Sequence, residues 1–344
     1  MPRVPRRPDF GSRRSKPPVS TAKSLRDYAA CGLIIVLCLL YSRGSHTLTC
    51  TSQSLIHEIW TRGRNAGYAY LQLRGCPCHM LPSWSAAEES NEYLAEKDLP
   101  WSNDLPQQLA QLQEELGANR LISAFGIAVS DPMYEEEVNI AAAAAYLAGI
   151  VVPPGETASL NSIIGPFTTE RGYAIGPTYM GTDIIGTLAG GVCKVASCLY
   201  NVVIAGDLQI VERHPHSMMV TYVPPGRDAT IAWGAKDFRF RNNKDTPVLI
   251  WAEFAKGCLY VALYGQFQPP QVQWHAKELS RQPTWTIRRA NPQLPKGAAR
   301  LIKGFDAITV QTWITVKYPG QPVEHRDLGV DSYRALPHIL EYAP

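Results

Sequence analysis

The most apolar stretch of the chain lies near its N-terminus and contains no charged residue. It runs from Tyr28 to Tyr41 and reads YAACGLIIVLCLLY. A membrane-spanning helix needs roughly 17–25 such residues, so the run is short for one and also suits the hydrophobic region of a signal peptide. No clear cleavage site of small residues follows it. We expect an uncleaved membrane anchor at residues 28–42, with a cleaved signal peptide as the alternative.

Helical patterns occupy three places in the first two thirds of the chain. A polar, mixed region contains a helical stretch from Gln107 to Leu116. The segment from Glu135 to Ala148 has acids in its first turn and then a run of alanines, which predicts a strong helix that ends at Gly149. A third helix is predicted to begin at Cys193 and to end at Gly206, with Leu199, Val202 and Val203 as its core stripe.

Strand patterns dominate the second half. Alternating or short apolar runs predict strands at residues 121–127, 150–152, 208–213, 219–223, 230–233, 237–241, 285–289 and 307–317. Residues 248–254 and 259–264 form a predicted hairpin around Lys256-Gly257. The pattern indicates an α+β fold in which the helices from 135 and 193 pack on a mainly antiparallel sheet from 208–265, with a β-rich C-terminal extension.

The distribution of charged residues supports a membrane anchor and indicates on which side of the membrane each end of it lies. The chain has 344 residues, and residues 1–26 hold eight of its 33 basic side chains but only one of its 30 acids, Asp9. Basic residues beside a membrane segment favour the cytoplasmic side, so we expect a single-pass protein with its bulk outside the cell membrane. The basic residues lie on a tail and not on a folded domain, which argues against nucleic-acid binding.

The composition is that of a globular protein, with 45% hydrophobic and 18% charged residues, and it excludes collagen, coiled coil and wholesale disorder. We therefore divide the chain into five parts. These are a basic cytoplasmic tail (1–27), the anchor or signal segment (28–42), an N-terminal extracytoplasmic region without a chemical motif (43–118), a central α+β domain (119–267) and the β-rich extension (268–344).

Six cysteines lie beyond the anchor, where export permits disulfides: Cys50, Cys76, Cys78, Cys193, Cys198 and Cys258. Five residues along one helix exceed the ~7 Å limit between the Cα atoms of a disulfide, so Cys193 and Cys198 should not pair. Either Cys76 or Cys78 could pair with Cys50.

Cys193 is the sharpest chemical feature, because it opens a predicted helix directly after Gly190-Gly191. Unpaired N–H groups and the helix dipole stabilise a thiolate at such a position and could also bind an oxyanion. A thiol enzyme also needs a histidine and an orienting group. His214 or His216 and then Asp228 follow in the order seen in papain-like and transglutaminase-like hydrolases.

Other interpretations of these residues remain open. Taken alone, the pattern favours a buried structural cysteine with surface histidines, and Asp228 could pair with Arg227 or cap a turn. A zinc site built from Cys193, His214 and His216 is less favoured, because no supporting metal motif exists. Glu170 and Arg171 are expected to form a surface ion pair. The glycines lack the spacing of a nucleotide-binding loop, and we expect neither a metal nor a cofactor.

Taken together, residues from about 120 to 265 resemble the VanW-like family, bacterial envelope proteins associated with glycopeptide-resistance clusters. The matching segments are Asn139-Ile140, Ala142–Gly149, Pro154-Gly-Glu156, Asn161, Gly165-Pro166, Glu170-Arg-Gly-Tyr173, Gly190-Gly191-x-Cys193, Ser197, Leu199-Tyr-Asn201, Glu212-Arg-His-Pro-His-Ser217, Tyr222-Val-Pro224, Gly226-Arg-Asp-Ala-Thr230 and Asn242-Asn243. The extension, with Tyr333, resembles the β-rich extension common in this family.

The matching segments contain the candidate site of Cys193, His214 or His216, and Asp228. Supporting or ligand-contacting residues would be Glu156, Asn161, Glu170, Arg171, Gly190, Gly191, Ser197, Tyr200, Asn201 and Arg227. Two departures from the family pattern matter: Ala189 replaces the first of three glycines, and Lys194 replaces a glutamine after the cysteine. If that glutamine donates to an oxyanion, the amide is lost here, although the charge of Lys194 still lowers the pKa of Cys193.

Two functions of different classes follow. The first is a membrane-anchored thiol enzyme that acts on an amide or ester of peptidoglycan or of its peptide stems. The second is a non-catalytic module that binds the cell wall, in which the polar residues hold the fold or contact a ligand. A reactive, accessible Cys193 favours the first, and a buried or bridged Cys193 favours the second.

Overall fold

The computed structural model describes residues 93–130, 132–133, 135–180 and 183–344. The expected tail and anchor, Cys50, Cys76 and Cys78 lie outside the described residues, as does most of the expected region 43–118. Within the described ranges, no helix combines the length and the hydrophobicity that a membrane crossing requires.

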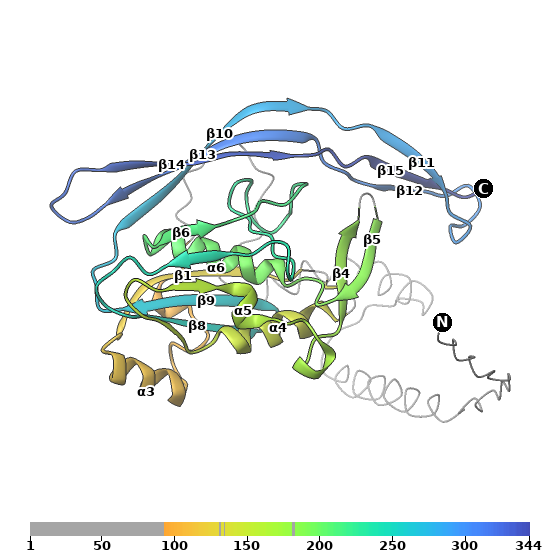
Figure 1. Ribbon diagram of the computed structural model, residues 1–344. Coiled ribbons are helices and arrows are strands. Elements are labelled where there is room, and N and C mark those ends of the chain that lie inside the picture. Colours follow the sequence, from red (N-terminus) through yellow and green to blue (C-terminus); the bar gives the residue numbers. More distant parts are fainter. Residues whose placement is uncertain (1–92, 131, 134, 181–182) are drawn as a thin grey trace, which may run out of the picture. The chain divides into compact units, whose positions relative to one another are not determined.

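The central sheet has four antiparallel strands in the order β1 (Arg120–Ala128), β9 (Cys258–Gly265), β8 (Val248–Ala255) and β2 (Ile150–Val152). Every position of β9 is buried, so both faces of the sheet are covered (Figure 1). The predicted hairpin between β8 and β9 is confirmed. Its turn places Lys256 and Gly257 at φ values of 54° and 75°, as a tight two-residue turn requires.

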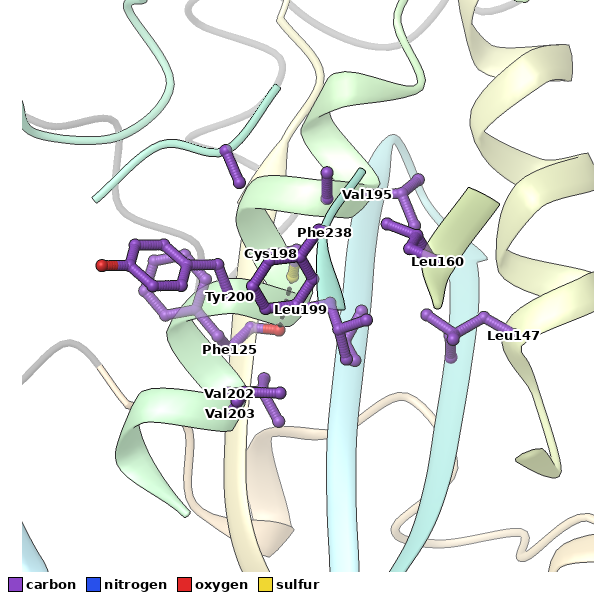
Figure 2. Close-up of a cluster of buried hydrophobic side chains, with 14 of the residues drawn as sticks. Phe125, Leu147, Leu160, Val195, Cys198, Leu199, Tyr200, Val202, Val203 and Phe238 are labelled. Atoms are coloured by element: carbon purple, nitrogen blue, oxygen red, sulfur yellow. Dashed lines mark hydrogen bonds between the residues drawn. The ribbon is translucent and has the colours of Figure 1, made fainter. Parts of the chain in front are cut away.

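Two helices cover one face of this sheet. Helix α4 (Glu136–Leu147) packs on β8, and helix α6 (Cys193–Ala205) packs on β1 and β9, as predicted. Leu147, Val195, Leu199 and Phe125 belong to the core between these layers (Figure 2). Leu199, Val202 and Val203 of α6 lie in the core as predicted, and burial extends beyond them to every residue from 195 to 205. Such a helix is fixed on all sides.

The other face of the sheet has a smaller core of its own. Helix α3 (Gln107–Leu116) inserts Leu109 there, beside the second face of β8 and β9. Trp101, just after the short helix η1 (Glu96–Asp98), donates from its ring nitrogen to the hydroxyl of Tyr264 at 2.8 Å. The period-two alternation of β9 thus supplies both cores.

A second, three-stranded antiparallel sheet has the order β3 (Thr157–Ser159), β7 (Arg239–Arg241) and β6 (Gln209–Glu212). The helix α5 (Leu160–Ile164) and the short helix η2 (Thr169–Arg171) lead to the hairpin of β4 (Ile175–Met180) and β5 (Asp183–Leu188). The sheet predicted over 208–265 is therefore divided. Its first strands join β3, whereas its last hairpin is completed by β1 and β2.

The C-terminal part is β-rich, as predicted. One antiparallel sheet has the order β10 (Gln271–Gln282), β13 (Ala307–Lys317) and β14 (Glu324–Tyr333); another has the order β11 (Thr286–Ala290), β15 (His338–Tyr342) and β12 (Ala299–Ile302), in which β11 and β15 are parallel (Figure 1). Val272, Ile314 and Val316 of the first sheet belong to the same core as α4 and α6. The extension is thus continuous with the central fold.

Two predicted strands, at 219–223 and 230–233, are absent. Both segments are irregular in structure, apart from an isolated bridge between Ala232 and Lys236. Their apolar residues still reach the core: Val223 and Ile231 are buried. The alternating pattern reflects the burial of these side chains. The backbone of the two segments does not pair into a sheet.

Candidate active site around Cys193

Cys193 is the first residue of α6 and follows a tightly packed glycine loop. A Cβ on Gly190 would lie 2.1 Å from the carbonyl carbon of Gly176, and Gly191 has a φ of 98° with Glu136 against it. Neither position accepts a side chain without rearrangement. The buried Asn139 of α4 donates from Nδ2 to the carbonyl of Gly190 at 2.9 Å. These contacts fix the start of the helix and hence the thiol.

The Cys193 thiol is half-buried and free of any disulfide. Its Sγ donates to the carbonyl oxygen of Ile231 at 3.7 Å. The N–H groups of Lys194 and Val195 donate to carbonyls of the preceding turn. Among the described residues, no acceptor takes the N–H of Cys193 itself, so that group can donate to an oxyanion beside the sulfur.

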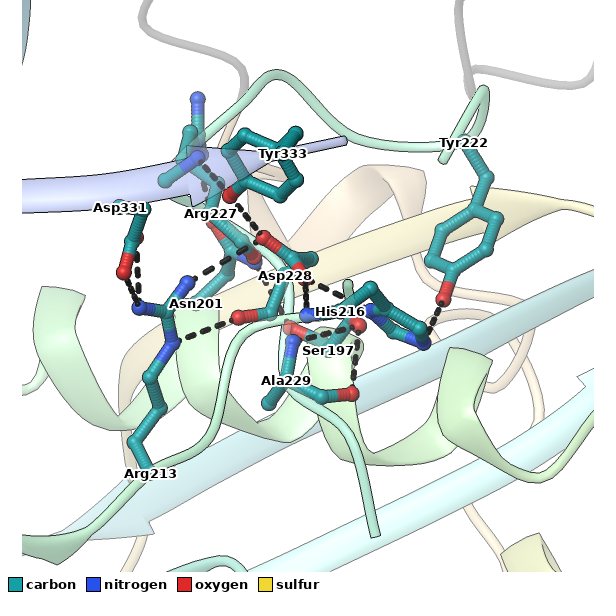
Figure 3. Close-up of polar contacts among 11 residues, drawn as sticks. Ser197, Asn201, Arg213, His216, Tyr222, Arg227, Asp228, Ala229, Asp331 and Tyr333 are labelled. Atoms are coloured by element: carbon teal, nitrogen blue, oxygen red, sulfur yellow. Dashed lines mark hydrogen bonds and ion pairs between the residues drawn. The ribbon is translucent and has the colours of Figure 1, made fainter. Parts of the chain in front are cut away.

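His216 lies between this thiol and Asp228. Its Nδ1 is 2.6 Å from Oδ2 of Asp228, and its backbone N–H donates to the same oxygen at 2.7 Å (Figure 3). The hydroxyl of Tyr222 lies 3.5 Å from Nε2. Because Asp228 takes Nδ1, Nε2 is the nitrogen left to exchange a proton with the thiol.

Asp228 is a fully buried carboxylate with four donors around it. Besides the two bonds from His216, its Oδ1 accepts from the hydroxyl of Tyr333 at 2.5 Å and from Nη2 of Arg213 at 3.2 Å (Figure 3). A buried charge needs such partners to remain ionised. The carboxylate is therefore held in one orientation towards the imidazole.

Helix α6 also fixes the segment that carries Asp228. The hydroxyl of Ser197 accepts from the N–H of Ala229 at 2.9 Å and donates to its carbonyl. One turn later, Asn201 donates to the carbonyl of Arg227 and accepts from its Nε. Cys193, Ser197 and Asn201 are spaced by four residues, so one face of a single helix presents the thiol and holds the loop of Asp228.

The pKa values of these groups favour a charged pair. Burial alone would raise the pKa of Cys193, but the hydrogen bond and charge of His216, with the charge of Lys194, lower it. Burial likewise opposes protonation of His216, yet its bonds to Asp228 and Cys193 raise its pKa to about 9. Burial would raise the pKa of Asp228, and His216 and Arg213 instead lower it. Together these shifts stabilise a thiolate beside an imidazolium.

Lys194, the residue in place of the family's glutamine, turns away from the oxyanion position. Its Nζ pairs with Oε1 of the buried Glu136 and lies 5.1 Å from the ring centre of Tyr222. The cation is thus largely neutralised. Its remaining effect at the site is the small lowering of the pKa of Cys193.

The two candidate histidines have different surroundings. His214 points to Oε1 of Glu212 at 2.9 Å, with over a third of its side chain exposed. Only His216 interacts with Cys193 and Asp228. Within the described ranges, no three side chains of the usual ligand types are grouped as a metal site would need. His214 thus lies with Glu212 and not with Cys193 and His216, as a zinc site of all three residues would require.

Four predicted supporting residues lie away from the thiol. Glu156 is exposed. Asn161 donates from Nδ2 to the carbonyl of Lys236, in the loop before β7. The expected pair of Glu170 and Arg171 is wrong: Glu170 accepts from Thr169, and the guanidinium of Arg171 lies 3.9 Å from the ring centre of Tyr146.

Tyr200 and Arg227 also have structural surroundings. Tyr200 is buried against Phe238 and Trp274. Arg227 bonds to Asn201, and the guanidinium beside Asp228 is that of Arg213 instead. The pairing of Asp228 with its sequence neighbour is therefore wrong.

Several residues of the site were not predicted. Arg213 and Asp331 form a doubly bonded ion pair at 2.7 and 2.6 Å, next to Asp228. Asn139, Arg213 and Tyr222 lie in segments that resemble the family, and Tyr333 lies in the extension, but the sequence assigned none of them to the site. Asp331 gave no signal, and the contact of Tyr333 with Asp228 depends on segments brought together only by the fold.

The central region of the chain is similar to known proteins. Residues 135–264 match the protein family described as VanW like protein. The uncharacterized protein YoaR of Bacillus subtilis is 42% identical over 37% of this chain and 42% of its own length. The vancomycin B-type resistance protein VanW of Enterococcus faecalis is 27% identical over 40% of this chain and 53% of its own length. The chain thus spans about half the length of these relatives.

Two solved G5 domains are similar to 22% of the chain. The IgA1 protease G5 domain matches with a TM-score of 0.15 and 15% identity over 94% of its length, and HP0197-G5 with a TM-score of 0.12 and 18% identity over 99%. Likenesses of this size assign neither fold nor function. The family match and both relatives concern the region that holds the thiol, so residues 135–264 form a VanW-like region of this chain.

Proposed function

We propose that the protein is a cell-envelope enzyme that transfers or hydrolyses acyl groups through the thiol of Cys193. His216 is the proton carrier and Asp228 its orienting partner. The observation that supports this most is the position of His216, which contacts the thiol through one side and a buried carboxylate at 2.6 Å through the other. This is the arrangement that activates nucleophilic thiols.

The reaction would proceed in two balanced steps. The Cys193 thiolate attacks the carbonyl carbon of an amide or ester, and the resulting oxyanion accepts the N–H of Cys193. As the bond to the leaving amine or alcohol breaks, imidazolium His216 gives it a proton, which leaves a thioester. Water or an acceptor amine then attacks the thioester and gives its proton to His216, which regenerates the thiolate.

The envelope setting rests on similarity and on the N-terminal sequence. One relative is named a vancomycin resistance protein, which concerns the cell wall. We therefore propose peptidoglycan, or a peptide linked to it, as the substrate. In this proposal residues 28–42 anchor the chain in the cell membrane, and the central domain 119–267 and extension 268–344 lie outside.

The test is thiol chemistry on the full chain, with the two histidines as a matched pair. His216→Ala should raise the pH midpoint of Cys193 alkylation towards that of an ordinary thiol, about 8.5. His214→Ala should leave it unchanged. Incubation with muropeptides should add an acyl mass to Cys193, and Cys193→Ser should abolish that adduct. Equal profiles for both histidine variants and the wild type would reject the assignment.

A non-catalytic wall-binding module is the second candidate, and one observation favours it. Lys194, held by Glu136, offers no amide beside the thiol where the family has a glutamine. In that case muropeptides would bind without forming an adduct, and binding would survive the Cys193→Ser change. The same experiment therefore separates the two functions.

A further inference from the structure

Two side chains of the C-terminal extension reach into the thiol site. Tyr333 is 2% exposed; its hydroxyl donates to Oδ1 of Asp228 at 2.5 Å and accepts the N–H of Gly226 at 2.7 Å. Asp331 receives both bonds from Nη1 of Arg213. Tyr333 is the last residue of strand β14, and Asp331 lies two positions before it. The two side chains therefore face the same side of the strand.

The contact is close along the backbone as well. Gly226 has a φ of 85°, and a Cβ there would lie 2.3 Å from the methyl group of Thr312 on β13. The chain after β14 also pairs with the loop after His216, since the N–H of Arg334 donates to the carbonyl of Ser217 at 2.8 Å. The extension therefore packs directly on both loops that carry the histidine and the aspartate.

We propose that Tyr333 and Asp331 are positioning residues for the thiol site, so that the site is complete only when the extension is present. This inference rests on the proposed function. The family match ends at residue 264, and both positioning residues lie beyond it. The extension is then a working part of the active site, in addition to any role as a separate module.

The carboxylate geometry explains why Tyr333 matters. Oδ2 of Asp228 is occupied by His216, and among the described residues Oδ1 is bonded to the Tyr333 hydroxyl at 2.5 Å and to Arg213 at 3.2 Å. Without the phenol, the closer of these two Oδ1 bonds is lost and the carboxylate gains freedom to rotate. A misplaced carboxylate holds the imidazole less well, and the thiolate loses part of its stabilisation.

Asp331 acts one step further away, through Arg213. The guanidinium uses Nη1 for Asp331, Nη2 for the carboxylate of Asp228 and Nε for the Asp228 carbonyl at 2.8 Å. Removal of the Asp331 charge leaves Arg213 free to swing towards Asp228 or away from it. In either case the field at His216 changes without a change in any residue of the family-matched region.

The experiment measures the rate of Cys193 alkylation by iodoacetamide against pH in the full chain, with mass spectrometry to identify the modified residue. Tyr333→Phe should raise the midpoint by about half to one pH unit and slow the reaction at neutral pH about three- to tenfold. Asp331→Asn should also move the midpoint. It provides a second measurement if Tyr333→Phe fails to fold.

Tyr318→Phe is the matched control. Tyr318 is also on the extension and donates its hydroxyl to a buried carboxylate of the central fold, Asp207, at 2.5 Å. Its loss should lower the melting temperature about as much as Tyr333→Phe does and leave the Cys193 profile unchanged. Equal profiles for wild type, Tyr333→Phe and Asp331→Asn would overturn the inference. An ordinary thiol midpoint in the wild type would overturn the proposed function itself, and the inference with it.

Discussion

At the scale of single residues, two cysteines on one helix allow a direct test of the charged pair. Cys193 is half-buried beside His216, whereas Cys198 is fully buried with its Sγ 3.3 Å from the carbonyl oxygen of Phe125. The two thiols share a helix and differ in environment. Any difference in their reactivity therefore reports the site and not the helix.

We expect Cys193 of the native chain to be alkylated at neutral pH, with a midpoint below the ordinary thiol value of about 8.5, and Cys198 to remain unmodified. Acyl transfer should fall above about pH 9, where His216 loses its proton. Since the pKa of His216 is raised, its protonation stabilises the folded chain below its ordinary value of 6.5, and this contribution is lost as the pH rises through about 9. Equal labelling of Cys193 and Cys198 would contradict the expected difference in their reactivity.

Ala189 has a backbone conformation that suits glycine. Its φ is 60°, in the left-handed region, and the residue is 3% exposed. An L-residue loses roughly 1–2 kcal/mol there, which the greater chain entropy of glycine offsets in part. Ala189→Gly should therefore stabilise the chain by about 0.5–1 kcal/mol in urea unfolding. As a control, Ala145→Gly on the exposed face of α4 should destabilise it by about 1 kcal/mol.

At the scale of elements, the site depends on α4 as much as on α6. Asn139 of α4 donates to the carbonyls of Ala174 and Gly190 and accepts the N–H of Ala174. This one side chain joins the glycine loop to the residue just before β4. The thiol is thus positioned from two helices, of which only one carries a residue with an obvious chemical role.

Asn139→Ala should cost about 2–4 kcal/mol, because it leaves one buried and up to two part-buried backbone groups without partners. Chemical denaturation of the full chain measures this. Asn243→Ala, at an exposed position, is the control and should change stability by less than about 0.5 kcal/mol. A near-zero effect of Asn139→Ala would mean that water replaces its bonds and that the loop does not need it.

The elements also show what sequence patterns could and could not predict. The helices at 107–116, 135–148 and 193–205 and the hairpin at 248–264 were predicted because each has local signals: acids, alanines, glycine ends or a tight turn. The strands at 219–223 and 230–233 were wrong, because burial alone produced their alternation. Which strands share a sheet also depends on long-range pairing that no local pattern contains.

At the scale of the molecule, the central fold and the first sheet of the extension share one core. Val272, Ile314 and Val316 pack in the same cluster as α4 and α6. Sequence placed a boundary near residue 267 because Pro269-Pro270 follows a hairpin. The boundary has no counterpart in the packing, and the contacts of Tyr333 could not be foreseen from a strand more than 100 residues away from Asp228.

We therefore expect α6 and β13 to unfold together. Native-state hydrogen exchange should show their most protected amides converging on one opening free energy as urea is added. The sheet of β11, β15 and β12, outside the shared core, serves as the internal comparison and should open at a lower free energy. Exchange of β13 at that lower value would show that the extension is an independent unit.

The burial of α6 on every side has a consequence for the dynamics of the site. Cys193 and the two side chains that hold the Asp228 loop, Ser197 and Asn201, lie on this one helix. The motion of the Asp228 loop is therefore coupled to that of the thiol. A displacement of this loop relative to Cys193 has to break the bonds of Ser197 and Asn201, which favours a preorganised pairing of thiol and carboxylate in the folded chain.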